Sequence, residues 1–263
     1  MNQAATVYLV GAGPGNADLL TLKAYRLMQQ ADVVIYDRLI GEDILDMIPA
    51  TAQRIFVGKR SGHHSLPQDE INQLLVQLST RHRHIVRLKG GDPFIFGRGS
   101  EEALFLKQHN IAFEIVPGVT AAAACSAYAG VPLTHRGLSR NVKLMTGHFR
   151  DDEALQLSAS DVHSDTTLVI YMGLSNLQQI CGSLMRQGIP ANRPAMAIQD
   201  GTSAQQRRVI SNVKNLPQQV KAAGLRSPVL IVISNTVVLA RQLDWFDPQV
   251  IQDEATHATW LEA

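Results

Sequence analysis

The sequence has very few cysteines, no long apolar run and no clear excess of either charge. Cys125 and Cys181 are the only two cysteines among 263 residues and form no CxxC pair, so neither a disulfide framework nor a thiolate metal site is expected. Lys and Arg number 24 against 23 Asp and Glu, and the net charge of +1 argues against a general binder of nucleic acid or membrane surfaces. No apolar run reaches the ~18 residues of a membrane helix, and the first residues do not resemble a signal peptide. We therefore expect a soluble, cytoplasmic protein.

What the chain does have is an alternation of short apolar runs with helix-period segments. Hydrophobic residues make up 45% of the chain, which is enough for a substantial core. In the first half the alternation is typical of a parallel α/β sheet. Ile71, Leu74, Leu75 and Leu78 have the spacing of a helix that covers one face of that sheet. The predicted strands are residues 6–10, 32–36, 54–57, 84–88 and 113–116.

A second α/β lobe is predicted after the turn at Pro117 and Gly118. A helix over 121–129 opens it, and further helices are expected over 176–186 and 216–223. Its predicted strands are 142–146, 167–171, 195–199, 207–210 and 229–233. The sequence thus predicts a two-lobed α/β fold, each lobe a sheet flanked by helices. The expected divisions are residues 1–117, 118–246 and a tail, 247–263, without clear periodicity.

The segment LKGGDPFIFGRG, residues 88–99, indicates a ligand site. A strand-like run leads into glycines around one carboxylate, Asp92, and such glycines let the main chain approach a bound molecule closely. Arg98 adds a planar cation suited to carboxylates, so an acidic ligand is expected beside the loop.

A second glycine turn, GAGPG at residues 11–15, follows the first predicted strand and leaves an alternative open. A strand, a glycine turn and then a helix are typical of dinucleotide-binding enzymes, and Asp37 closes the second strand where a ribose-binding acid is expected. However, Asn16 stands where the third glycine of that pattern belongs, and Pro14 removes an N–H donor. An oxidoreductase is therefore the weaker hypothesis.

Taken together, GAGPG, VIYDRL, VGKR, LKGGDPFIFGRG, PGVTAA, GVPLTHR and YMGL resemble the tetrapyrrole methylase family, from Val7 to about Phe246. Within that family the resemblance points to enzymes that use S-adenosylmethionine, which becomes S-adenosylhomocysteine, to methylate two rings of uroporphyrinogen III. The product is precorrin-2, a precursor of sirohaem and cobalamin. The resemblance implies a cofactor cleft between two lobes and a homodimer. Some members are fused to a dehydrogenase and ferrochelatase region, and the stand-alone form is expected here. Methylation of another corrinoid, or a non-catalytic sensor on the same fold, are the alternatives.

The resemblance also implies roles for particular residues. Asp37 matches a proton acceptor, and Lys59 matches a proton donor, although Lys59 also suits a charge clamp for a substrate carboxylate. Arg98 and Glu101 either hold a substrate carboxylate and take a proton, or form a simple ion pair within a helix. The cations expected around the polyacidic substrate are Arg38, Lys59, Arg60, Arg98 and Arg136. The expected cofactor contacts are Pro14, Gly90, Gly91, Asp92, Ile95, Thr120, Ala121, Met172 and Gly201. No metal site is expected, because no histidine pair has a cysteine or carboxylate cluster at ligand spacing.

Overall fold

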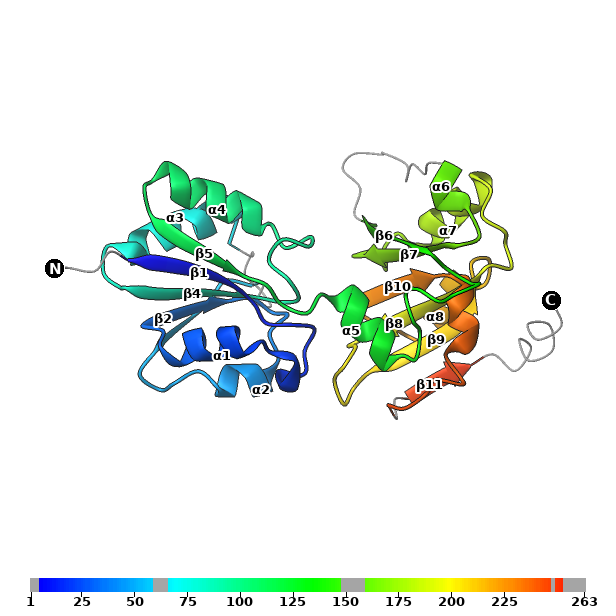
Figure 1. Cartoon of the computed structure of the whole chain (residues 1–263), viewed down its shortest axis with the longest axis horizontal. Helices are drawn as coiled ribbons and strands as arrows, with labels where there is room; N and C mark the ends of the chain where they lie inside the picture. Colours follow the sequence, from blue (N-terminus) through cyan, green and yellow to red (C-terminus); the bar gives the residue numbers. More distant parts are fainter. Residues whose placement is uncertain (1–4, 59–65, 148–158, 247–248, 253–263) are drawn as a thin grey trace. The chain divides into compact units, whose positions relative to one another are not determined.

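A computed structural model describes residues 5–58, 66–147, 159–246 and 249–252 (Figure 1). The chain divides into two compact units, Met1–Thr120 and Ala121–Ala263, each with its own sheet. The ten strands expected from the sequence are all present, and the two-sheet α/β class is confirmed. Within the described ranges, no helix is long and apolar enough to cross a membrane.

The sheet of unit 1 has five parallel strands in the order β3-β2-β4-β1-β5. Val10 of β1 lies between Leu88 of β4 and Val116 of β5, which sets the register of these three adjacent strands. The carboxyl ends of all five strands therefore lie along one edge. The strands are β1 Thr6–Gly11, β2 Val33–Tyr36, β3 Gln53–Phe56, β4 His84–Lys89 and β5 Ala112–Val116.

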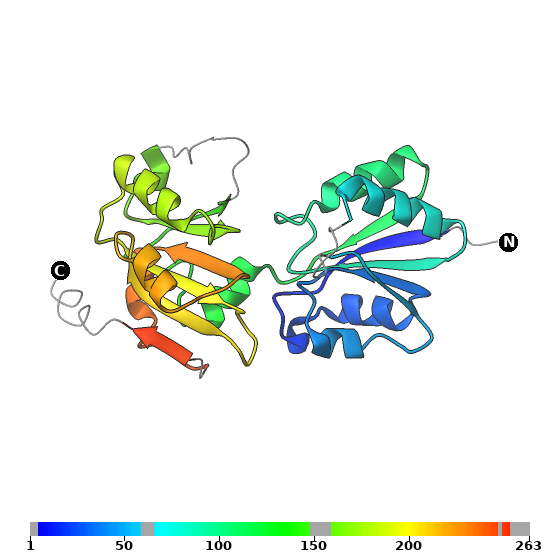
Figure 2. The same ribbon diagram turned by 180° about the vertical axis from the view of Figure 1, so that it is seen from behind.

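Two helices cover each face of this sheet (Figures 1 and 2). On one face, α1 (Leu22–Gln29) and α2 (Glu42–Asp46) pack in a core with the side chains of Val10, Val86 and Leu88. On the other, α3 (Gln68–Ser79) and α4 (Gly99–Gln108) pack in a core with Leu9, Ile35 and Ile85. A short 3-10 turn, η1 (Ala17–Leu19), follows the first glycine turn. Because β1 leads to a helix on one face and β4 to a helix on the other, the connections diverge between these adjacent strands.

At the opposite edge, Asp32 ties the beginning of β2 to β4. Its Oδ2 accepts the main-chain N–H groups of Arg83 and His84 at 2.8 and 2.9 Å. The bond from His84 lowers the pKa of Asp32 below 3.8, and the bond from Arg83 adds to this, against an opposing effect of burial.

We expect Asp32→Asn to lower the free energy of unfolding at pH 7 by about 1 kcal/mol, since an amide oxygen is a weaker acceptor than a carboxylate. A carboxyl group with a lowered pKa in the folded state stabilises the fold above the unfolded pKa and loses this effect as pH falls. The difference from the unsubstituted protein should therefore shrink below about pH 4. Urea unfolding across this range measures it, with the exposed Asp46→Asn as a control that should show no such trend.

Unit 2 has a mixed sheet in the order β11-β9-β8-β10-β7-β6. Helices α7 (Leu177–Arg186) and α8 (Leu216–Ala222) pack in one core, and α5 (Ala121–Tyr128) with the 3-10 turn η2 (Asn235–Leu239) packs in the other. A short helix, α6 (Ala159–Val162), precedes β7. The strands are β6 Asn141–Thr146, β7 Thr166–Tyr171, β8 Pro194–Gln199, β9 Arg207–Asn212, β10 Val229–Ile233 and β11 Gln249–Gln252.

The strand β11 differs from expectation. The tail, residues 247–263, is expected to be weakly ordered or to lie on a partner, yet Gln249–Gln252 pair in parallel with Arg207–Ile210 of β9. A strand at the edge of a sheet is held mainly by main-chain hydrogen bonds, which leave little trace in the pattern of side chains.

Candidate active site

The two glycine segments predicted from the sequence lie side by side at the carboxyl edge of the unit 1 sheet. Beyond the ends of β1 and β4, the N–H of Ala12 donates to the carbonyl of Lys89 at 2.8 Å. Gly13 and Gly91 then exchange two hydrogen bonds, of 2.7 and 3.2 Å. At this point the connections after β1 and β4 pass to opposite faces of the sheet, and open α/β sheets bind their ligands at such a position. The structure therefore brings the turn containing Pro14 together with Gly90, Gly91 and Asp92.

Two glycines, Gly11 and Gly118, make this convergence possible. A Cβ on Gly11 would lie 2.5 Å from the main-chain N of Gly118 and 2.7 Å from the carbonyl O of Gly91. A Cβ on Gly118 would overlap the same carbonyl of Gly91. Since the obstructing atoms belong to the main chain, no side chain can move aside to make room.

We expect Gly118→Ala to lower the free energy of unfolding by about 2–4 kcal/mol, because the added methyl group forces the ends of β1, β4 and β5 apart. The matched control is Gly182→Ala within α7, where the only neighbour of the added Cβ is a flexible arginine end at 3.4 Å. That change should be neutral or slightly stabilising. Thermal and urea unfolding of both variants test the comparison, and equal stabilities would contradict it.

Asp92 holds the loop that carries it. Its Oδ1 accepts the N–H of Phe94 at 2.8 Å, and its Oδ2 accepts the N–H of Gly118 at 3.1 Å. Each carboxylate oxygen keeps a further lone pair for a ligand donor. Asp92 therefore links β4 to β5 and still presents acceptors at the carboxyl edge. Ile95 follows in the same loop, and its N–H donates to the carbonyl of Asp92 at 3.3 Å.

Arg98 and Glu101 form the ion pair that is one of the two alternatives raised by the sequence. Arg98 immediately precedes α4, and its Nε and Nη2 donate to the carboxylate of Glu101 at 2.9 and 2.6 Å. This bond raises the pKa of Arg98. Both side chains are about half exposed, so the pair contributes little to stability and remains accessible. Arg98 and Phe96 both have left-handed φ angles, 58° and 54°, and such strain in non-glycine residues is common where loops serve a function.

Asp37 lies at the end of β2, two residues beyond Ile35 and so on the same face of the strand. Its Oδ1 accepts the N–H of Leu39 at 3.0 Å, which fixes a tight turn. Its Oδ2 lies 3.5 Å from Nη2 of Arg87. The side chain remains 27% exposed, so the carboxylate is both held and reachable.

Behind Asp37 is a buried charge cluster that sequence reasoning missed. Arg87 and Lys89 project from β4, and both donate to Oε1 of Glu102 in α4, at 3.2 and 3.0 Å. The side chain of Glu102 is fully buried, and Arg87 and Lys89 are nearly so. Burial lowers the pKa of Lys89 and the charge of Arg87 lowers it further, against an opposing effect of Glu102. Charged residues alternating with apolar ones in a central strand were the available signal, because such side chains require a buried partner.

In unit 2, three expected cofactor residues lie around the start of α5. The N–H of Ala122, next to Ala121, donates to the hydroxyl O of Tyr171 at 2.9 Å, and Met172 follows Tyr171 at the end of β7. Gly201 packs against Cys125 of α5, so closely that a Cβ there would overlap the sulfur. Met172 is half exposed and has a left-handed φ of 55°. The structure thus brings Ala121, Met172 and Gly201 to one region of unit 2.

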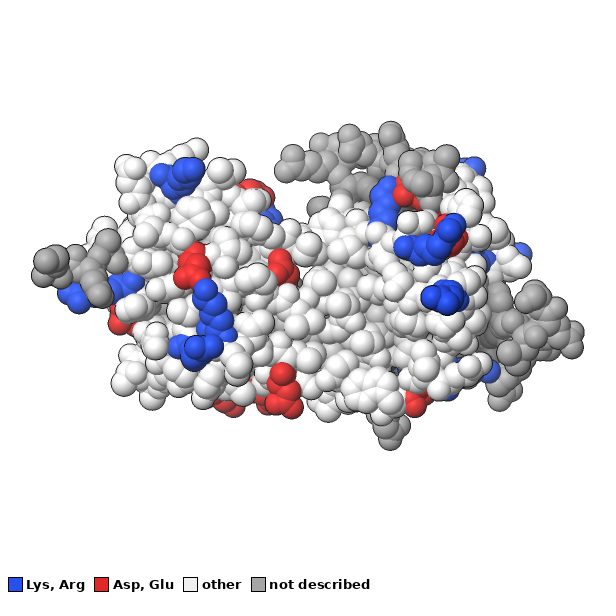
Figure 3. Space-filling model, in the orientation of Figure 1, with Lys and Arg blue, Asp and Glu red and all other residues white. Residues whose placement is uncertain are grey.

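The remaining predicted positions belong to both units. Arg38 is exposed after β2, Arg136 is exposed in the turn before β6, and Thr120 ends unit 1. Lys59 and Arg60 lie outside the described residues. On the face shown in Figure 3, basic and acidic side chains are interspersed, so binding of an acidic ligand depends on local cations rather than on a general field.

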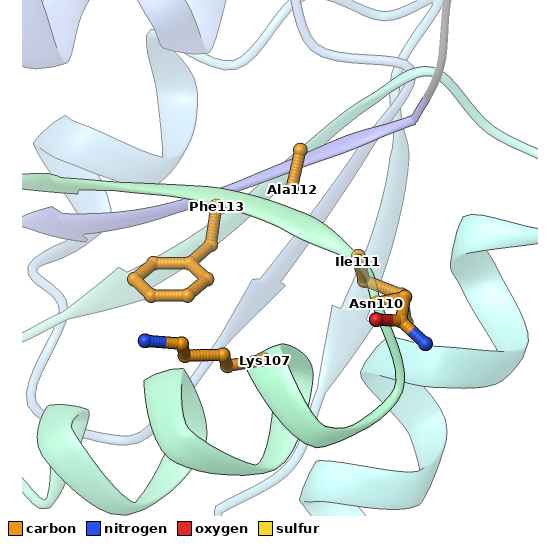
Figure 4. Close-up of a pocket in the computed structure, with 5 residues that line it drawn as sticks. All are labelled: Lys107, Asn110, Ile111, Ala112 and Phe113. Carbon is orange, nitrogen blue, oxygen red and sulfur yellow. The ribbon is translucent and has the colours of Figure 1, made fainter.

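A shallow hollow lies at the other edge of the unit 1 sheet, and none of the residues predicted to form the site lines it (Figure 4). It lies where α4 ends and β5 begins. It contains one charged side chain among apolar and amide groups and is lined by Lys107, Asn110, Ile111, Ala112 and Phe113. The glycine loops at the carboxyl edge are therefore the stronger candidate.

Comparison with known proteins agrees with this architecture. Residues 6–217 match the family described as Tetrapyrrole (Corrin/Porphyrin) Methylases. A siroheme synthase of Thiobacillus denitrificans is 49% identical over 257 residues, which cover 98% of this chain and 53% of the relative. The chain belongs to the tetrapyrrole methylase family. It spans about half the length of the curated relatives it matches.

Two solved structures share the fold. One is a uroporphyrin-III C-methyl transferase from Thermus thermophilus complexed with S-adenyl homocysteine. It is 37% identical, with a TM-score of 0.74 over 89% of this chain and 93% of that one. The other is a cobalt precorrin-4 methyltransferase of cobalamin biosynthesis, 27% identical, with a TM-score of 0.76 over 88% of this chain and 95% of that one.

Proposed function

We propose that this protein transfers methyl groups from S-adenosylmethionine to two ring carbons of uroporphyrinogen III, forming precorrin-2. The observation that carries the proposal is the 37% identity to the Thermus enzyme, which extends over 93% of that chain. The name of that enzyme gives the substrate and the carbon acceptor, and its bound S-adenyl homocysteine is what remains of the donor after methyl transfer.

The glycine loops of unit 1 fit such a donor. Their main-chain groups approach closely without side chains, and the second lone pairs of Asp92 can accept from a hydroxyl or an ammonium group. In unit 2, exposed Met172 offers apolar contact. When bound, S-adenosylmethionine supplies an electrophilic methyl group. The proposed contacts are Pro14, Gly90, Gly91, Asp92, Ile95, Thr120, Ala121, Met172 and Gly201.

The residues of this chain would then orient the substrate and move a proton. Methylation of a ring carbon leaves a positive charge on the pyrrole ring, which is relieved when the substrate loses a proton from a ring nitrogen or a bridging carbon. Asp37 is our proposed acceptor of that proton, because its carboxylate is held in one position and reachable. Glu101 is the alternative acceptor, although it is paired with Arg98. Lys59 is proposed as proton donor or charge clamp, and Arg38, Arg60, Arg98 and Arg136 as cations for substrate carboxylates. We also propose that the protein forms a homodimer, as the resemblance implies, and that it is cytoplasmic.

A binding titration separates this proposal from a dinucleotide enzyme. We expect S-adenosylhomocysteine and S-adenosylmethionine to bind and NAD not to bind. Anaerobic incubation with S-adenosylmethionine and uroporphyrinogen III should then yield tetrapyrroles with one and two added methyl groups by mass spectrometry. Binding of NAD alone would favour the oxidoreductase.

The likeness to the precorrin-4 enzyme makes methylation of another corrinoid the second candidate. Cofactor binding without turnover of uroporphyrinogen III, but with methylation of a later intermediate, would favour it.

A further inference from the structure

We infer that Arg87 is a positioning residue for Asp37, and that Glu102 holds Arg87 in place for this task. The inference rests on the proposed function, in which Asp37 accepts the proton. It assigns a part in the reaction to two buried residues that are not proposed to touch the substrate.

The first step is the geometry of the guanidinium group. Nε of Arg87 donates to Oε1 of Glu102 at 3.2 Å, and Nη1 donates to the carbonyl of Leu88 at 3.0 Å. A guanidinium is planar and rigid, so fixing two of its nitrogen atoms determines the direction of the third. The third nitrogen, Nη2, faces Oδ2 of Asp37 at 3.5 Å.

Second, the exposure of the side chains increases along the series of contacts from Glu102 through Arg87 to Asp37. The side chain of Glu102 is 0% exposed, that of Arg87 is 4% exposed and that of Asp37 is 27% exposed. The contacts therefore run outward from the core between β4 and α4 and end at the group proposed to meet substrate. A cation that served only to neutralise Glu102 would not need to reach the edge of the sheet, and Lys89 already contacts the same oxygen.

The third step is the charge of the cluster. Arg87 and Lys89 face one buried carboxylate, Glu102, whose other contact through Oε1 is the neutral amide of Gln68 at 3.2 Å. Its Oε2 is buried and has no hydrogen-bond partner among the described residues. Two cations against one anion leave a positive charge directed at Asp37, which provides the second negative charge that the cluster requires. Asp37 is thus held from one side by the N–H of Leu39 and from the other by Arg87.

The test compares Arg87→Gln and Arg87→Lys with the unsubstituted enzyme in the methyl-transfer assay, with rates expressed per folded molecule. Because a small misplacement of a reacting group costs about 100-fold, Arg87→Gln should lower kcat by roughly that factor, with KM and the Kd of S-adenosylmethionine within about twofold. Arg87→Lys keeps a cation in the core but lacks the planar fork, so about a tenfold loss of kcat should remain. Lysine at this position also provides a variant that folds if the glutamine variant does not.

Arg208→Gln is the matched control. Arg208 is a fully buried arginine of unit 2 that donates to the carbonyl of Ala129 and to Asp244, so its loss should lower stability while kcat per folded molecule is unchanged. Should both Arg87 variants keep kcat within about threefold of the unsubstituted enzyme, or lose kcat only in parallel with cofactor affinity, Arg87 is structural and the inference is wrong. Absence of methylated product with the unsubstituted protein would instead overturn the proposed function, and the role of Arg87 with it.

Discussion

Asp37→Asn should lower kcat by about 100- to 10,000-fold while the Kd of S-adenosylmethionine stays within about twofold. The amide has the size of the carboxylate and can still accept the N–H of Leu39, so the turn after β2 is kept. It cannot take the proton that the substrate must lose after a ring carbon has been methylated. Steady-state kinetics and a binding titration on the same preparation measure the two quantities.

The control for this substitution is Asp43→Asn. Asp43 is an exposed aspartate of α2 and has no part in the proposed proton transfer. Its kcat should equal that of the unsubstituted enzyme. A parallel loss of cofactor affinity and kcat in Asp37→Asn would show that Asp37 belongs to the cofactor pocket or supports the fold, and Glu101 would then become the better candidate for the proton acceptor.

The second large effect is expected on stability, from Glu102→Gln. This change leaves Arg87 and Lys89 buried without their shared carboxylate, and breaking a buried pair in this way costs about 3–5 kcal/mol. The neighbouring Glu101→Gln removes only a half-exposed ion pair and should cost less than about 1 kcal/mol. Urea unfolding of the two variants at pH 7 makes the comparison, and similar costs would contradict a buried, charge-balanced cluster.

The loss in free energy of unfolding caused by Glu102→Gln, called the deficit below, should become smaller as the pH rises. Because the pKa of Lys89 is lowered in the folded state, the unfolded chain binds more protons than the folded chain between that lowered pKa and 10.5. Stability therefore rises with pH in this window. Loss of Glu102, which acts to raise this pKa, widens the window, so the deficit should shrink as the pH rises from neutral towards 10.5. A deficit that grows with pH would show that Lys89 is not held as described.

Much of the fold could be predicted from the sequence, because most of the predicted strands are short, largely apolar runs followed by a polar residue, glycine or proline. The strand order was not readable, since it depends on which strands pair across the sheet and not on any local pattern. The same holds for β11, whose pairing with β9 uses the main chain.

The candidate site was only partly readable. The glycines near Asp92 predict a close approach of the main chain to another group. In the structure, much of this close contact is between the main-chain segments that follow the strands, at Gly11, Gly91 and Gly118. Arg87 and Glu102 lie outside the glycine motifs, in a strand and a helix, and their side chains meet only in the folded core.

The most direct measurement uses S-adenosylmethionine labelled with ¹³C in its methyl group, incubated anaerobically with the unsubstituted protein and uroporphyrinogen III. We expect labelled tetrapyrrole in which the methyl groups are bonded to ring carbons, give a C-methyl carbon resonance and survive base hydrolysis, with one S-adenosylhomocysteine formed for each methyl transferred. Label lost on base hydrolysis would reveal methyl esters on the substrate carboxylates, and S-adenosylhomocysteine formed without labelled tetrapyrrole would show that methyl transfer is uncoupled from this substrate. Either result would contradict the account.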